Sequence, residues 1–393
     1  MTKLYKHSKE PEVYYYFNAN GEKLWMFRHR YYDSSGKRRE KKKSGFKTDK
    51  AAIKALMEVK ALTLQGNTKQ LDYDNMTVSK WLDIWYESNY IKWAPTTQEI
   101  RKNAIENRLK PMIGNYKLHK LDRATYQREF INKLVEKFKP NSIKTWHSIF
   151  RIAINAAVDE EILPRNRFIK VSIPDEEEVI NDNYLTEKEL NILLDYAKEH
   201  ATITNYTALL VLSYTGMRKG ELMGLHWKNI DFDNNTITIE HTRDRNGTRK
   251  PKTNNSYRTI LLDPFVIEQL KKYKAWCKQV QFKHGIKLKD DQLVFISEDG
   301  AIPISEVRLN KALKKITKKT GINTITIHGL RHTHATILLN RNANVKAIAE
   351  RLGNSVDMIN RIYGHLTKDS SAALINIFSE SLNVSGAKSG ANE

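Results

Sequence analysis

The chain has 393 residues and a net charge of +21, from 66 Lys and Arg against 45 Asp and Glu. This length predicts two or three domains, and so large a positive charge favours a polyanionic partner. The single cysteine, Cys277, excludes internal disulfides, and no Cys or His spacing fits a zinc finger. The apolar runs are too short to span a membrane, and the charged start MTKLYKHSKEPE does not resemble a secretory signal, so we expect a cytoplasmic protein with no membrane partner.

Residues 1–64 combine a high positive charge with a strand-like pattern. They hold 16 basic and 7 acidic side chains, and the stretch VYYYFNANGEKLWMFRHRYY alternates aromatic or apolar residues with polar ones. With turn signals at Asn20-Gly21 and at Gly36, this pattern predicts a three-stranded sheet, followed by a helix that Thr48 caps. The basic third strand is a candidate DNA-binding surface, although lysines also keep an edge strand soluble. Its candidate contacts are Lys37, Arg38, Arg39, Lys41, Lys42 and Lys43.

Two polar segments, 65–76 and 174–183, interrupt the hydrophobic periodicity and predict linkers. Residues 65–179 carry 19 basic and 16 acidic side chains, so this part of the chain is nearly balanced in charge. Its basic residues fit solvated helix faces and DNA contacts equally well. Residues 77–173 show only helical patterns, which predicts an all-helical second domain. Its helix starts are expected at Thr77, Pro95 and Asn141.

A third segment begins near residue 184 and mixes helices with a few strands. Thr186 and Glu189 have the spacing of a capping box, which predicts a helix start. Further along, glycines flank Arg218, and Glu221 follows one helical turn later if Arg218 starts a helix. An Arg/Glu pair at this spacing is usually a surface ion pair, so the pair alone does not indicate catalysis.

Lys252 and Tyr363 carry no functional signal on their own. Residues 236–241 and 258–262 alternate like strands, so Lys252 lies in a predicted hairpin loop, where an exposed lysine is ordinary. Tyr363 ends the stretch SVDMINRIY, just before Gly-His, and a tyrosine there would normally serve packing. An amphipathic helix that Gly353 closes is expected before this stretch.

The densest polar cluster is HGLRHTHAT, residues 328–336. On a helix, His328 and Arg331 share one face. Metal binding by His328, His332 and His334 is one interpretation of the cluster. It is disfavoured, because the cluster has neither the HExxH pattern nor a nearby cysteine or acid. We therefore predict no metal site.

None of these motifs is specific alone, but their order along the chain resembles that of a known protein family. A glycine-flanked arginine, a hairpin lysine, an HxxR pair, a Leu-Gly turn and a tyrosine before Gly-His together resemble the catalytic domain of tyrosine recombinases, in the integrase subgroup. The resemblance covers essentially the whole chain and implies an α+β multidomain fold. It implies an arm-type DNA-binding domain at 1–64, a helical core-binding domain at 77–173, and a mainly helical catalytic domain with a small antiparallel sheet at 184–383. The tail at 384–393 is expected to be disordered.

Carried over position by position, the resemblance implies a role for each motif residue. Two arginines would bind the phosphate, a lysine would act as general acid, a histidine as acid/base group and a tyrosine as nucleophile. These are, in that order, Arg218 and Arg331, Lys252, His328 and Tyr363, with Glu221 and His332 as supporting residues. One position departs from the family pattern, because nine residues before Tyr363 this chain has Asn354 where the family usually has histidine and sometimes tryptophan. The asparagine amide can still donate a hydrogen bond to the phosphate, but it carries no charge and no transferable proton.

These residue types suit phosphodiester exchange without a cofactor. Two guanidiniums can neutralise the charge that grows on the phosphoryl oxygens. A covalent phosphotyrosine keeps the energy of the broken bond, so rejoining needs no ATP. The sequence contains neither a Walker-type phosphate loop nor a GxGxxG loop, and we expect no cofactor.

The resemblance implies a site-specific DNA recombinase that integrates and excises a mobile element such as a prophage or a conjugative transposon. Expected partners are double-stranded DNA with core and arm attachment sites, further copies of the chain in a homotetramer, and an excisionase or DNA-bending protein, all at the nucleoid in the cytoplasm. An apolar stripe near the end could dock on a neighbouring subunit or on its own domain; it consists of Leu374, Ile377, Phe378 and Leu382.

Two alternative functions remain. One is a DNA-binding regulator without catalysis, which Asn354 favours, and the other is a type IB topoisomerase, against which the basic N-terminal domain argues.

Overall fold

The computed structural model describes residues 3–33, 36–175, 183–251 and 256–363, and for residues 362 and 363 it describes the backbone alone. The chain divides into two compact units, residues 1–179 and 180–393. Within the described residues, no helix is both long and apolar enough to cross a membrane.

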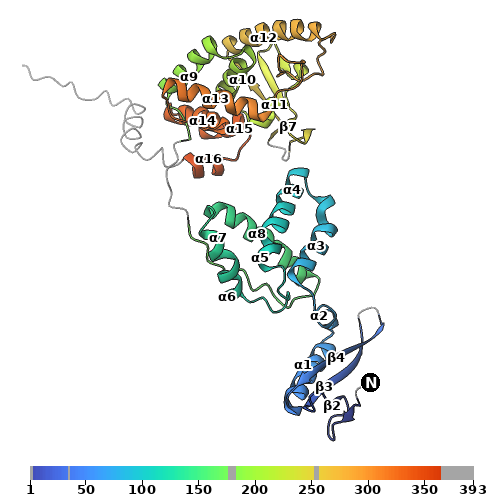
Figure 1. Cartoon of the computed structure of the whole chain (residues 1–393). Helices are drawn as coiled ribbons and strands as arrows, with labels where there is room; N and C mark the ends of the chain where they lie inside the picture. The colour runs from blue at the N-terminus through green and yellow to red at the C-terminus, as the bar shows by residue number, and fades with distance from the viewer. Residues whose placement is uncertain (1–2, 34–35, 176–182, 252–255, 364–393) are drawn as a thin grey trace, which may run out of the picture. The chain divides into compact units, whose positions relative to one another are not determined.

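The first unit begins with an antiparallel sheet and a helix packed against it, drawn in blue in Figure 1. The helix begins where the Thr48 hydroxyl accepts a hydrogen bond from the Ala51 backbone N–H, and Val13, Phe27 and Leu56 form the core beneath it. The predicted sheet and helix are confirmed, but the sheet has four strands where we predicted three. The extra strand is only two residues long, too short to show an alternating pattern. The elements are β1 (Tyr5–Lys6), β2 (Val13–Phe17), β3 (Lys23–Tyr32), β4 (Arg38–Phe46) and α1 (Asp49–Leu64), followed by the short α2 (Thr68–Asp72).

The rest of the described first unit is helical, as predicted. Its core is rich in aromatic side chains, and the Trp81 indole N–H donates to the Ala153 carbonyl at 2.8 Å. Thr77 caps α3 and Pro95 is the first residue of α4, but α8 begins at Pro140, one residue before the predicted start, because proline suits the first helical position. The helices are α3 (Val78–Asn89), η1 (Tyr90–Lys92), α4 (Pro95–Ala104), η2 (Ile105–Leu109), α5 (Lys110–Ile113), α6 (Arg123–Tyr126), η3 (Gln127–Asn132), α7 (Lys133–Val135) and α8 (Pro140–Asp159).

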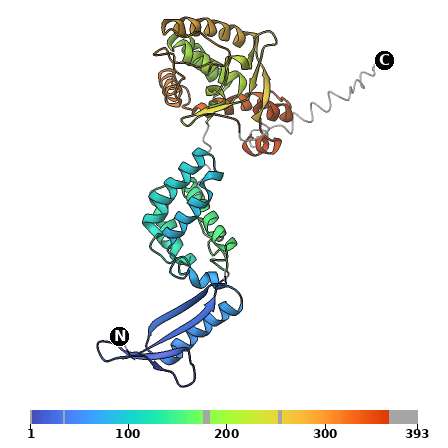
Figure 2. The same ribbon diagram turned by 90° about the vertical axis from the view of Figure 1, so that its right-hand side faces the viewer.

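The second unit is built around helix α10 (Ile203–Thr215), which is buried on nearly all sides. Helices α9, α12, α13 and α14 pack against it (Figures 1 and 2). Helix α9 starts with the predicted capping box, in which Thr186 Oγ1 accepts from the Glu189 N–H at 3.2 Å and Glu189 Oε2 accepts from the Thr186 N–H at 2.9 Å. The remaining helices are α9 (Glu187–His200), α11 (Lys219–Met223), η4 (Trp227–Asn229), α12 (Pro264–Lys283), α13 (Glu306–Thr320), α14 (Ile327–Asn340), α15 (Val345–Leu352) and α16 (Val356–Tyr363).

The described strands of the second unit form two small antiparallel sheets, one more than the single small sheet we expected. The three-stranded sheet has the order β5-β6-β9, and β7 forms a hairpin with β8. Residues 252–255, between β8 and β9, lie outside the described part of the chain. The strands are β5 (Ile230–Asp231), β6 (Thr236–Ile239), β7 (Thr242–Asp244), β8 (Gly247–Arg249) and β9 (Arg258–Leu261).

A separate small core holds α14, α15 and α16 together. Ala335 of α14, Ile348 and Leu352 of α15, and Ile359 of α16 are buried in one cluster. Gly353, with a φ of +65°, ends α15 as predicted. This packing fixes the turn between α15 and α16, and with it position 354, against α14.

Candidate active site

A left-handed glycine places Arg218 at the start of α11. Gly216 ends α10 with a φ of +63°, and a Cβ there would lie 2.5 Å from Leu352 Cδ2 and 2.8 Å from His334 Cδ2. Glycine is therefore required by both the conformation and the space. Arg218 is the N-cap of α11, and its backbone N–H donates to Glu221 Oε2 at 2.8 Å. The two side chains thus lie one turn apart, at the predicted spacing.

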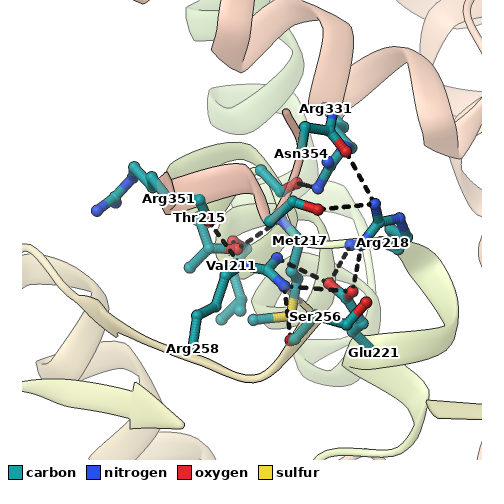
Figure 3. Close-up of polar contacts among 12 residues, drawn as sticks. Val211, Thr215, Met217, Arg218, Glu221, Ser256, Arg258, Arg331, Arg351 and Asn354 are labelled. Atoms are coloured by element: carbon teal, nitrogen blue, oxygen red, sulfur yellow. Dashed lines mark hydrogen bonds and ion pairs between the residues drawn. The ribbon is translucent and has the colours of Figure 1, made fainter. Parts of the chain in front are cut away.

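Glu221 is a buried carboxylate shared by two arginines. Only 3% of its side chain is exposed; Arg218 Nη1 lies 2.8 Å from Oε1, and Arg258 Nη2 lies 2.9 Å from Oε2 (Figure 3). Burial acts to raise the pKa of this carboxyl, but the hydrogen bonds and charges of Arg258 and Arg218 outweigh burial and hold the pKa below its usual value. Glu221 is therefore ionised, and its ion pair with Arg218 is not an ordinary surface pair.

Asn354 contacts Arg218 directly. Its Oδ1 accepts from Arg218 Nη2 at 2.9 Å, and the Gly353 carbonyl accepts from the same nitrogen at 3.3 Å. Because a guanidinium only donates, the amide must turn its oxygen toward Arg218, and its NH₂ group then points its donors elsewhere. Asn354 therefore keeps the donor capacity that a phosphate contact requires.

Helix α14 supplies Arg331, His328 and His332. Arg331 is 3% exposed, and its Nη1 donates to the Gly216 carbonyl at 2.9 Å, which places it beside the turn that carries Arg218. The rings of His328 and His332 lie 4.8 Å apart and nearly perpendicular to each other. The helix thus brings two imidazoles and a guanidinium to one place.

Both of these imidazoles are neutral near pH 7. His328 is exposed overall, yet desolvation of its ring by the surrounding protein, together with the neighbouring His332, Arg331 and Arg218, lowers its pKa to about 4. Burial and the charge of Arg331 also lower the pKa of His332. A neutral imidazole beside two arginines can accept a proton.

His334 belongs to a different network. Its Nδ1 donates to the Ser213 carbonyl at 2.9 Å, and its Nε2 accepts from Arg351 Nε at 3.1 Å. Burial and the charge of Arg351 lower its pKa to about 4. With both ring nitrogens engaged, His334 joins α10, α14 and α15. In the part of the chain that the structure describes, no group of three His, Cys, Asp or Glu side chains is placed to hold a metal ion.

Two predicted catalytic side chains are not described. Lys252 lies outside the described residues, so its position in a hairpin loop stays a prediction. Tyr363 is the last residue of α16, where only its backbone is described. The predicted apolar stripe at 374–382 also lies outside the described residues. The predicted site residues that the structure brings together are Arg218, Glu221, His328, Arg331, His332 and Asn354.

The predicted DNA contacts of the first sheet do not form one surface. Phe27 and Tyr31 pack in the core under α1, so their strand neighbours Arg28 and Tyr32 face the other way. We call the face of the sheet opposite α1 the uncovered face. By cross-strand register, Arg38 and Lys42 lie on this face. The other basic residues of β4 lie on the side of α1: Arg39, Lys41 and Lys43. Arg39 Nε pairs with Asp33 at 2.9 Å, and Lys41 Nζ pairs with Asp74 at 3.2 Å. Lys37 precedes β4, and its backbone N–H donates to Asp33 Oδ1 at 2.9 Å.

Two arginines beside the candidate site, Arg258 and Arg351, were not predicted from the sequence. Arg258 is 7% exposed and binds Glu221, and Arg351 donates to the carbonyls of Tyr214 and Leu261 at 2.8 and 3.2 Å. A basic residue inside the apolar strand pattern SYRTILL was a signal for Arg258. Nothing marks Arg351, because arginine in the last turn of a helix is ordinary.

Three family models match the chain. They are the arm DNA-binding domain at 13–62, the N-terminal SAM-like domain of phage integrases at 77–135, and the phage integrase family at 183–370. The chain is 28% identical to a "Tyrosine recombinase XerC-like" protein of Caldanaerobacter subterraneus subsp. tengcongensis, over 76% of this chain and 82% of that protein. It is also 28% identical to the integrase of Staphylococcus phage L54a, over 79% of this chain and 95% of that protein.

Solved structures share the fold at lower sequence identity. A Tn1549 transposon integrase in complex with transposon right end DNA matches with a TM-score of 0.66 and 20% identity, over 77% of this chain and 100% of that chain. A lambda integrase dimer bound to a COC′ core site matches with a TM-score of 0.57 and 17% identity, over 91% of this chain and 95% of that chain. From the three family models and the two relatives, we conclude that the chain belongs to the phage integrase family of tyrosine recombinases, with an arm DNA-binding domain and a SAM-like domain before its catalytic domain.

Proposed function

We propose that this protein cuts and rejoins DNA at specific sites through a covalent 3′-phosphotyrosine at Tyr363, and so integrates and excises a mobile element. The observation that carries the proposal is the convergence of Arg218 and Arg331, from distant parts of the chain, beside a neutral His328. Similarity to phage and transposon integrases supports a mobile element as the DNA that is moved.

Arg218 and Arg331 would bind the scissile phosphate. Arg218 is held at Nη1 by Glu221 and at Nη2 by Asn354, while 38% of its side chain is exposed, so it is fixed and still open to a ligand. Arg331 is fixed by the Gly216 carbonyl. Guanidiniums held in this way need no rearrangement as negative charge grows on the phosphoryl oxygens, which is the condition for electrostatic stabilisation of a transition state.

The covalent step would exchange one ester bond for another. The Tyr363 phenolic oxygen attacks phosphorus, the bond to the 5′-oxygen breaks, and the strand keeps its 3′-phosphate on the tyrosine. Neutral His328 accepts the phenolic proton, and Lys252 gives a proton to the departing 5′-oxygen. The bound phosphate favours the imidazolium that forms, because an opposite charge raises the pKa of a histidine. Attack by the 5′-hydroxyl of another strand reverses the step and frees the tyrosine without ATP.

The uncovered face of the first sheet would contact arm-site DNA. Arg28, Arg30 and Lys42 lie on it with Arg38, and Glu40 between them pairs with Arg28 at 3.0 Å and Arg30 at 3.4 Å. A narrow antiparallel ribbon fits the DNA major groove, where such side chains reach phosphates and base edges. We further propose a homotetramer on paired core and arm sites, assisted by an excisionase or a DNA-bending protein, at the nucleoid in the cytoplasm.

A DNA-binding regulator without catalysis is the second candidate, because Asn354 stands where the family usually has histidine. The contact between Asn354 Oδ1 and Arg218 weighs against it, since the asparagine takes part in holding a phosphate-binding arginine. The adduct assay below distinguishes the two candidates.

Trapping of the covalent adduct tests the proposal. The probe is a nicked duplex that carries the core sequence found by sequencing the DNA that flanks the encoding gene, placed so that the short downstream fragment is lost after cleavage. The native protein should accumulate as an adduct on the 3′ side of the break, seen as a shifted band under denaturing conditions. Tyr363→Phe should bind the same DNA and give no adduct. Tyr257→Phe, at an exposed tyrosine, should still trap DNA.

Each outcome decides between the candidates. An adduct that persists in Tyr363→Phe would reject this tyrosine as nucleophile. A native protein that binds the probe without any adduct would favour the regulator. Relaxation of supercoiled DNA without strand exchange between two sites would favour a topoisomerase.

A further inference from the structure

The side chain of Arg258 links three segments of the second unit. It lies on β9 with 7% of its side chain exposed, and its Nη2 and Nη1 donate to the two carboxylate oxygens of Glu221 at 2.9 and 3.3 Å. Its Nε donates to the Arg351 carbonyl at 2.7 Å, and Nη1 also donates to the Ser256 carbonyl at 3.1 Å. All three guanidinium nitrogens are used inside the protein, so Arg258 is not placed to bind a phosphate.

These contacts close a ring through the candidate site. From Glu221 the ring runs to Arg218, then from Arg218 Nη2 to Asn354 Oδ1 (Figure 3). It returns along the backbone to the Arg351 carbonyl, which accepts from Arg258, and Arg258 binds Glu221. The orientation of Arg218 and the position of Asn354 are therefore set by one closed structure.

Electrostatics give Arg258 a specific task within this ring. Glu221 is 3% exposed, and a buried carboxylate with a single guanidinium partner is incompletely compensated. Without Arg258, the carboxylate would attract the whole Arg218 guanidinium, including the nitrogen that now contacts Asn354. With Arg258 present, one nitrogen of Arg218 serves Glu221 and the other reaches Asn354.

We propose that Arg258 is a positioning residue, which holds the Arg218 guanidinium through Glu221 and through the turn at 351–354 in the orientation that binds the scissile phosphate. This inference rests on the proposed function. Arg258 itself does not reach the phosphate, and DNA affinity is shared among many contacts. Its loss should therefore change the rate of cleavage and leave the affinity for DNA nearly intact.

Full-length Arg258→Lys is the first test, on the nicked duplex described above. Lysine keeps the charge but lacks the planar fork, so it cannot bind Glu221 and the Arg351 carbonyl together. At saturating protein, the rate of adduct formation should fall roughly 10²-fold, the scale for a catalytic group displaced by about 1 Å, and DNA affinity should stay within about twofold of native. Protection of the buried Cys277 thiol gives the folded fraction, so the rate is expressed per folded molecule.

Arg341→Lys is the matched control. Arg341 also forms a forked ion pair with a glutamate in this unit, with Nε and Nη2 at 2.9 and 2.7 Å from the carboxylate of Glu187. This pair is exposed, at 71% and 45% of the two side chains, and its two contacts involve none of the residues of the ring. Its rate of adduct formation should equal that of the native protein.

A double-variant cycle separates positioning from general support of the fold. If Arg258 acts through Glu221, then Glu221→Gln should slow cleavage by a similar factor. Arg258→Lys/Glu221→Gln should then be no slower than the slower single variant, because both changes break the same link. A residue that only supports folding would change the folded fraction and leave the rate per folded molecule unchanged.

Two results would overturn the inference: a native cleavage rate in folded Arg258→Lys, or rate losses that multiply in the double variant. In either case, an adduct formed by the native protein would still support the proposed function. If the native protein forms no adduct on its own site, both fail. A slow Arg258→Lys with native DNA affinity and a non-additive cycle would establish the positioning role.

Discussion

Gly216→Ala should destabilise the second unit and slow DNA cleavage. A φ of +63° costs a residue with a Cβ about 1–2 kcal/mol. The added Cβ would also meet Leu352 Cδ2 at 2.5 Å and His334 Cδ2 at 2.8 Å. The leucine end can shift, but His334 is held by Ser213 and Arg351, so overpacking should add about 1–3 kcal/mol. The free energy of unfolding should therefore fall by about 2–5 kcal/mol.

Cys277 provides an assay for the second unit alone. It is the only cysteine of the chain, and it is fully buried in the core of this unit. Its reaction with a thiol reagent across a urea titration therefore reports the unfolding of this unit without a contribution from residues 1–179. The shift of the urea midpoint, multiplied by the slope of the transition, gives the change in the free energy of unfolding.

Gly321→Ala is the matched control. Gly321 ends α13 with a φ of +69°, but a Cβ there meets no atom within 4 Å. This variant carries the conformational cost without the close contacts, so its loss should be about 1–2 kcal/mol and its cleavage rate should be native. Equal urea midpoints for the two variants would refute the reasoning, because the contacts with His334 and Leu352 would then have no energetic weight.

Two further predictions concern single side chains of the same unit. Asn354→Ala should slow adduct formation by roughly 10²–10³-fold, the cost of a lost donor to a growing oxyanion. Asn354→His should still form the adduct. An alanine variant with the native rate would place Asn354 outside the site. Lowering the pH from about 6.5 to about 4 should destabilise the unit. In this range His334 is protonated in the unfolded chain, where its pKa is about 6.5, but stays neutral in the folded unit, where its pKa is about 4. His334→Gln should reduce this dependence in the Cys277 assay with an acid-tolerant thiol reagent, while His328, whose pKa is also about 4, accounts for part of the remaining slope. An unchanged pH slope would show that His334 does not contribute.

Local features of the fold were predictable from the sequence. The caps at Thr48, Thr77 and Thr186 each join a side chain to a backbone N–H three residues away, so spacing alone reveals them. Strand β1 was missed because two residues show no period. In the structure, Tyr5 of β1 pairs with Tyr15 of β2. This contact exists only after the chain has folded back on itself.

The candidate site was predictable only where its contacts follow the chain. Arg218 and Glu221 are three residues apart, and His328 and Arg331 share a helix face, so their proximity follows from helical geometry. The bond between Arg258 and Glu221 spans 37 residues, which no periodicity reveals. Alternation along β4 separates its basic residues into two sets, but which set faces away from α1 depends on the packing of Phe27 and Tyr31.

Asparagine at position 354 agrees with the charge balance of the site. Arg218 and Arg258 share the single carboxylate of Glu221, and the charges of Arg331 and Arg218 already help to keep His328 neutral. In the absence of DNA, the same arginines would oppose protonation of a histidine at position 354, and a neutral imidazole offers one acceptor and one donor nitrogen. Asparagine offers the same pair, with Oδ1 on Arg218 and with amide N–H groups that could donate to the proposed phosphate. The replacement therefore keeps the hydrogen-bonding groups of a neutral histidine, and for this reason we expect cleavage to survive it.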